Sequence, residues 1–99
     1  MYVRIARFEG GEGNWDERIE DIRGRMAEGM RNPQEAMPVK RSLMLVDREG
    51  RRRANVMFCE SEDDLRKVDE YMNSMNPPSG TGTRTGVEMY EVAIDSDEL

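Results

Sequence analysis

The side chains best able to contact a small molecule in this sequence are polar and aromatic residues set among apolar ones. Arg4 and Asn55 each interrupt a stretch that otherwise reads as an apolar strand. A buried arginine or amide needs a partner, which a ligand can supply, whereas at a strand edge it needs no such explanation. The residues that we expect near a cavity are Arg4, Trp15, Asn55, Tyr71, Arg84 and Tyr90.

Methionines strengthen this expectation. The chain has nine methionines, and Trp15, Met26, Met30, Met72 and Met75 recur at helical spacing. Methionine adapts to irregular surfaces, so a cavity lined by methionine and aromatic side chains would suit a flat apolar ligand. The alternative is that these residues simply fill a core between helices and sheet.

Other familiar chemistries are missing. The chain has no histidine, and therefore lacks the commonest general base, the commonest transition-metal ligand and any Ser–His or Cys–His nucleophile pair. The acidic residues Glu60, Glu62, Asp63 and Asp64 fit a helix N-terminus better than a calcium loop, because they lack alternating acids around a central glycine. We expect no metal and no cofactor, and the pattern assigns no catalytic residue.

Three further segments have simple structural interpretations. Residues 80–86 (GTGTRTG) lead into a strand and lack the ending of a phosphate-binding loop, so we expect a connection. The alternative there is a lid in which Arg84 reaches an anionic ligand. The basic run 51–53 is expected to be a solvated turn, and Cys59 a small buried hydrophobic residue.

The hydrophobic pattern predicts the elements that must position these residues. Strands are expected over 2–9, 41–48, 53–60 and 87–94. One helix should begin after Asn14 and end before Pro33, and a second should begin after Ser61 and end before Pro77. The order β-α-β-β-α-β suits an α+β, ferredoxin-like fold, in which an antiparallel sheet carries two helices on one face.

The predicted strands are apolar on both faces. Leu43 and Leu45 point to one side of their strand, while Met44 and Val46 point to the other. A strand with one solvated face would alternate apolar and polar residues, so both faces of this sheet need a cover. Two helices can cover one face. A second copy of the chain is the simplest cover for the other, and we predict a homodimer formed through the sheet.

Length and charge limit the remaining possibilities. The 99 residues make a single domain, 1–99. The net charge of −6 argues against nucleic acid or an anionic membrane as a partner, and no apolar stretch approaches the ~20 residues of a membrane-spanning helix. A single cysteine without a signal-peptide pattern favours the cytoplasm.

The whole chain resembles the antibiotic biosynthesis monooxygenase-like (ABM) proteins of the dimeric α/β barrel superfamily. Three stretches carry the resemblance: MYVRIARFEG, LMLVDREGRRRANVMFCESEDDLRKVDEYM and TGVEMYEVAID. The resemblance implies that two four-stranded sheets pack face to face between subunits. It also implies a pocket in each subunit between the helices and the sheet.

The same resemblance implies an activity. Some members oxidise aromatic polyketide intermediates with oxygen and without metal or flavin, using Asn, Trp, Tyr and Arg side chains, types that stand here at Asn55, Trp15, Tyr90 and Arg84. The substrate carbanion then reduces oxygen, and the protein deprotonates, orients and excludes water. Other members degrade haem with an axial histidine, which this chain lacks. A cofactor-independent monooxygenase for an aromatic or polyketide-like compound is thus one expectation; a non-catalytic small-molecule-binding protein or a structural dimer is the alternative.

Overall fold

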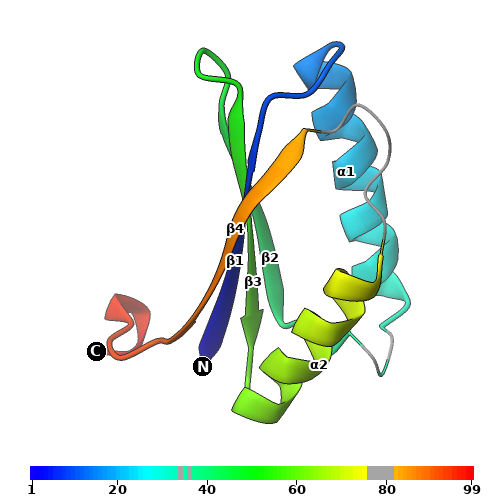
Figure 1. The fold of residues 1–99 in the computed structure, drawn as a ribbon. Coiled ribbons are helices and arrows are strands. Elements are labelled where there is room, and N and C mark those ends of the chain that lie inside the picture. Colours follow the sequence, from blue (N-terminus) through cyan, green and yellow to red (C-terminus); the bar gives the residue numbers. More distant parts are fainter. Residues whose placement is uncertain (34, 36, 76–81) are drawn as a thin grey trace.

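The computed structural model describes residues 1–33, 35, 37–75 and 82–99. In chain order the elements are β1 (Tyr2–Glu9), α1 (Trp15–Arg31), β2 (Arg41–Asp47), β3 (Arg52–Cys59), α2 (Glu62–Ser74), β4 (Thr83–Glu91) and the short 3-10 helix η1 (Ser96–Glu98). Both helices lie on one face of the sheet, and no element covers the other face within the described part of the chain (Figure 1). The predicted β-α-β-β-α-β, ferredoxin-like fold is confirmed.

Both helices begin where their capping residues predict. The Asn14 side chain accepts hydrogen bonds from the backbone N–H groups of Asp16 (2.8 Å) and Glu17 (3.4 Å), and Ser61 Oγ accepts one from Asp64 (3.1 Å). These bonds satisfy donors that a helix N-terminus leaves without an intrahelical partner. Helix α2 ends at Ser74; Pro77, which was expected to stop it, lies outside the described residues.

The sheet has the order β2-β3-β1-β4, and every neighbouring pair is antiparallel. The register brings residues from three strands into rows on the face that carries the helices. The rows are Ser42–Met57–Arg4, Met44–Asn55–Ala6 and Val46–Arg53–Phe8. Directly opposed residues in a sheet share a face, so these rows form the floor beneath the helices.

Strand β4 differs from its prediction. It begins four residues earlier than residue 87, since Thr83 already pairs with Glu9, and it ends at Glu91 rather than at residue 94. Part of the expected loop is therefore strand, which suits its β-branched threonines. Gly82 precedes the strand with φ +96°, and a Cβ there would lie 2.8 Å from the backbone oxygen of Glu9, so a side chain would not fit.

The core lies between α2 and one end of the sheet. Cys59, Leu65 and Val68 are buried there, and the partly buried residues around them are Tyr2, Met37, Val39, Met57 and Met72. Cys59 is fully buried, as expected, and burial raises the pKa of its thiol. Helix α2 packs directly on β1 and β3, whereas α1 stands farther from the sheet and buries only Trp15. This unequal packing leaves space between α1 and the sheet.

The helices are short and rich in charged residues. Of the helices in the described part of the chain, none is long and apolar enough to cross a membrane.

Candidate functional site

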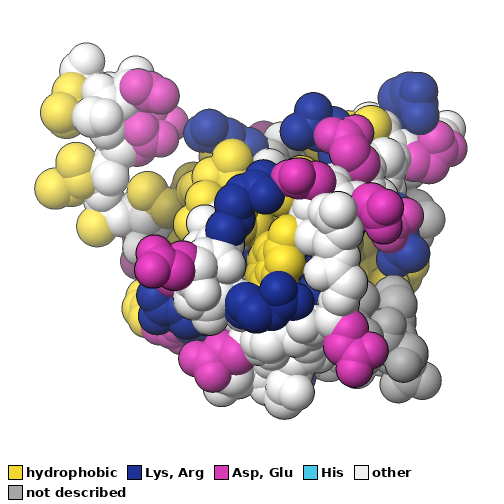
Figure 2. Space-filling view, turned by 90° about the horizontal axis from the view of Figure 1, so that it is seen from above, with side chains coloured by type: hydrophobic (Ala, Val, Ile, Leu, Met, Phe, Trp, Pro, Cys, Tyr) yellow, Lys and Arg dark blue, Asp and Glu magenta, His cyan; other side chains and the backbone are white. Residues whose placement is uncertain are grey.

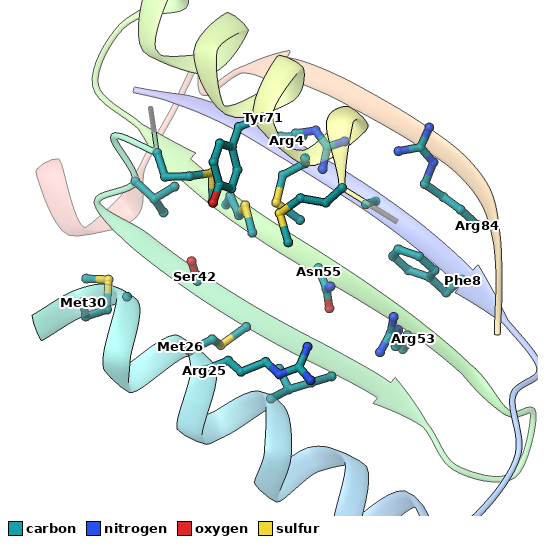
Figure 3. Close-up of a pocket in the computed structure, with 18 of the residues that line it drawn as sticks. Arg4, Phe8, Arg25, Met26, Met30, Ser42, Arg53, Asn55, Tyr71 and Arg84 are labelled. Atoms are coloured by element: carbon teal, nitrogen blue, oxygen red, sulfur yellow. The ribbon is translucent and has the colours of Figure 1, made fainter. Parts of the chain in front are cut away.

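A cavity of about 640 Å³ lies between the two helices and the helix-bearing face of the sheet (Figure 3). Its floor is formed by the β1, β2 and β3 residues of the rows described above, except Met44 and Val46, and α1 and α2 form its walls. Viewed from the end of the molecule that carries the start of α1, hydrophobic side chains lie at the centre with basic and acidic side chains around them (Figure 2). Among the described residues, the cavity lining itself combines many apolar side chains with five arginines and one aspartate.

Methionines dominate one part of the cavity. They come from both helices, from the residue after α2, from the segment before β2 and from β3, and they are Met26, Met30, Met37, Met57, Met72 and Met75. Met30 and Met75 are about half exposed, so the apolar stripes do not close into a solid core. Tyr71 lies at this end (Figure 3).

Arg53 is the most unusual residue of the site. It is only 9% exposed, and its guanidinium lies 4.3 Å from the centre of the Phe8 ring. Among the described residues, no carboxylate lies within ion-pair distance of it and its buried Nε has no hydrogen-bond partner. Burial lowers the pKa of Arg53, and the positive charge of Arg18 lowers it further.

The expectation of a solvated basic turn is therefore wrong for Arg53. Strand β3 begins at Arg52, and side chains alternate between the faces of a strand. Arg52 pairs with Asp47 at 2.6 Å in solvent, so the next residue, Arg53, faces the helices. The same alternation places Asn55 beside Arg53, about 7 Å farther along the strand.

Asn55 also lacks a partner. Its Oδ1 is buried and accepts no hydrogen bond from the part of the chain that the structure describes. Arg4, the other polar residue that interrupts a strand, is different. It is 2% exposed, and its guanidinium donates to Asp69 Oδ1 (3.0 Å) and Asn73 Oδ1 (3.3 Å). Arg4 thus ties β1 to α2, whereas Arg53 Nε and Asn55 Oδ1 are buried without a hydrogen-bond partner in the described part of the chain.

Arg84 reaches the cavity because β4 contains a bulge. Arg7 pairs with Gly86 but its neighbour Phe8 pairs with Arg84, which leaves Thr85 as an extra residue. A bulge of this kind re-aims the side chains beyond it, and here it turns Arg84 to the helix face. Arg84 Nη1 donates to Asn73 Oδ1 at 2.7 Å, and no carboxylate of the described residues pairs with it.

The remaining charged side chains of the described cavity lining come from α1 and are Arg18, Asp21 and Arg25. Asp21 contributes a carboxylate to the cavity lining and pairs with Arg25 at 3.2 Å. Nowhere in the described ranges do three or more His, Cys, Asp or Glu side chains gather in a group able to hold a metal ion.

Four of the six residues predicted near a cavity line it together: Arg4, Asn55, Tyr71 and Arg84. Trp15 and Tyr90 do not. Trp15 is buried, and the guanidinium groups of Arg18 and Arg51 each lie 5.5 Å from the centre of its ring. Tyr90 lies on the opposite face of the sheet and donates its hydroxyl hydrogen to Glu88, which raises the pKa of Tyr90.

The sequence reasoning missed Phe8 and Arg53, which also line the cavity. The alternation of side chains between the two faces of a strand could have identified both residues. Phe8 lies four residues after Arg4 on β1, and Arg53 lies two residues before Asn55 on β3, so each shares a face with a predicted site residue. Arg53 was overlooked because it belongs to a run of three arginines, of which the other two, Arg51 and Arg52, are exposed.

Comparison with known proteins agrees with the fold. No protein-family model and no curated protein matches the chain. Among solved structures, a crystal structure of a mutant of MhuD with two manganese protoporphyrin IX molecules bound per active site is similar, with a TM-score of 0.60 and 15% sequence identity over 96% of this chain and 97% of that one. The chain therefore shares the fold of that structure, in agreement with the ferredoxin-like arrangement described above.

Proposed function

We propose that this protein binds a small, largely apolar molecule in the cavity between its helices and its sheet. The observation that carries the proposal is the cavity itself. About 640 Å³ of space remains where the apolar stripes of two helices face a sheet, although protein interiors normally close such space. Cavities of this size, with apolar walls and a few placed polar groups, are typical of small-molecule sites.

The geometry favours binding over the oxygenation that the resemblance implied. A carbanion mechanism needs a positioned base. The carboxylate that the described residues place in the lining, Asp21, is exposed and engaged with Arg25. The porphyrins in the MhuD structure belong to that protein. The present chain has no histidine that could ligate a haem iron.

Fluorescence of the neutral probe N-phenyl-1-naphthylamine tests the proposal. We expect the probe to bind the protein with increased, blue-shifted emission, because it leaves water for the methionine-lined cavity. In Met26→Trp the indole would occupy the cavity, and we expect binding to weaken at least about tenfold. Ala27→Trp is the matched control, since Ala27 is the next residue of α1 and is exposed outside the lining.

Thermal unfolding of both variants shows whether they fold. Equal binding by the wild type, Met26→Trp and Ala27→Trp would place the probe elsewhere and contradict the proposal. Absence of binding to the wild type would also contradict it.

We further propose that the protein is a homodimer formed through the uncovered face of the sheet. That face carries apolar side chains from all four strands: Val3, Ile5, Leu43, Leu45, Ala54, Val56, Phe58 and Tyr90. Leu45 is 52% exposed and Tyr90 50% exposed, and the segment after β4, with Ile94 at 79% exposed, projects from this side (Figure 1). An apolar sheet face of this extent marks an interaction surface.

A second copy is the occupant that we favour, because both faces of the strands are apolar and the two helices cover only one. The single cysteine of the chain is buried and free, which agrees with the cytoplasmic location that we also propose. Leu45→Asp should convert the dimer to a monomer in native mass spectrometry, because it places a charge within the apolar face. Met75→Asp, a half-exposed residue on the helix side, should leave the dimer intact; an unchanged dimer in Leu45→Asp would contradict the assignment of the face.

A further inference from the structure

We propose that the ligand is an amphipathic carboxylate, and that its carboxylate group binds at the arginine end of the cavity between Arg53 and Arg84. This inference rests on the proposed function and adds the chemical class of the ligand. Its basis is the distribution of polar groups along the cavity.

Arg53 provides the strongest argument. The residue is 9% exposed, and its buried Nε has no hydrogen-bond partner among the described residues. A buried guanidinium remains charged, and a buried charge is stable only when an opposite charge or hydrogen-bond acceptors compensate it. The Phe8 ring at 4.3 Å offers only partial compensation. A carboxylate in the cavity would supply both the missing charge and the missing acceptor.

Arg84 adds a second cation from the opposite side of Phe8. Arg53 and Arg84 are both cross-strand neighbours of Phe8, one on β3 and one on β4, so their Cβ atoms lie roughly 10 Å apart. The side chain of Arg84 is held by the neutral amide oxygen of Asn73. An anion above Phe8 therefore competes with an amide rather than with a carboxylate for this guanidinium, and charge-assisted hydrogen bonds are the stronger ones.

The opposite end of the cavity fits the apolar part of such a molecule. In Figure 3, Phe8, Arg53 and Arg84 lie at one end, and Tyr71 and Met30 lie toward the other. Asn55 lies between the two ends with an unsatisfied buried Oδ1, where it can accept a hydrogen bond from a hydroxyl group of the ligand. A neutral or cationic molecule would leave Arg53 uncompensated.

Displacement of N-phenyl-1-naphthylamine by matched compounds tests the inference. We compare dodecanoate with methyl dodecanoate, and 2-naphthoate with methyl 2-naphthoate, so that alkyl and aromatic bodies are distinguished. We expect at least one acid to displace the probe about tenfold more effectively than its ester, the factor typical of one charge-assisted hydrogen bond in a buried site. Dodecylammonium should displace the probe less well than dodecanoate.

Two variants locate the effect. Arg53→Gln should remove the preference for the acid while the ester still binds, and Arg84→Gln should reduce the preference. Arg52→Gln is the matched control, since Arg52 is the adjacent residue with its side chain in solvent, and it should keep the preference. Equal displacement by acid and ester would overturn the inference and leave the proposed function standing; failure of the probe itself to bind would overturn the proposed function. An acid preference that survives Arg53→Gln would also overturn the inference.

Discussion

Replacing Arg53 by methionine should stabilise the ligand-free protein. A buried charge without compensation is costly, and replacing even paired buried charges by apolar residues of similar volume is often neutral or stabilising by about 1–4 kcal/mol. Arg53 is 9% exposed and has no carboxylate partner in the described residues. The variant loses the contact with Phe8, worth about 1 kcal/mol. We expect a net gain of about 1 kcal/mol in the free energy of unfolding, or ~4–8 °C in Tm for a domain of this size.

Urea unfolding and differential scanning calorimetry measure this change. Arg52→Met is the control: its ion pair with Asp47 is exposed, and loss of such a pair changes stability by less than about 1 kcal/mol. A second readout links stability to binding. Dodecanoate should raise the Tm of the wild type and should raise that of Arg53→Met far less.

A loss of more than about 1 kcal/mol in Arg53→Met would refute the reasoning. It would mean that the guanidinium is compensated within the folded chain, so that the cavity needs no anion. If Arg53→Met were more stable but dodecanoate raised its Tm as much as that of the wild type, the buried charge would be destabilising but would not take part in binding.

Three further predictions concern local features. Asn14→Ala should lower the free energy of unfolding by about 1 kcal/mol in urea, because the caps of Asp16 and Glu17 are lost, whereas Asn14→Ser should retain most of it; equal loss in both would argue against capping. Cys59 should react slowly with a disulfide reagent in the folded protein and rapidly in denaturant, because burial covers the thiol and raises its pKa; rapid reaction in the folded state would contradict its burial. Hydrogen bonds from the backbone N–H of Gly50 and from Arg52 lower the pKa of Asp47 below its ordinary value of 3.8. The contribution of Asp47 to stability should therefore be present above pH 3.8 and be lost as the pH falls through its lower pKa in the folded protein. A carbon-detected NMR titration measures this pKa, and Asp47→Asn should lack the pH-dependent contribution.

Local sequence patterns predicted much of the architecture. Asn14 and Ser61 mark the helix starts because their side chains satisfy backbone groups only a few residues away. Residues 2–9 form β1 as expected because alternation along a strand is a local property. The start of β4 was missed because its first residues become strand only through pairing with Glu9 and Arg7, which lie more than 70 residues earlier.

The site was only partly visible in the sequence. The sequence by itself determined the order of the elements, the absence of histidine, and the presence of Arg4 and Asn55 within apolar strands. Only the tertiary structure decided which of these polar groups is compensated: Asp69, 65 residues away, satisfies Arg4, and nothing in the described chain satisfies Asn55 Oδ1. The tertiary structure also decided that Arg53 is buried and its neighbour Arg52 is exposed. The burial of a residue depends on what packs on its face of the sheet rather than on the residue type.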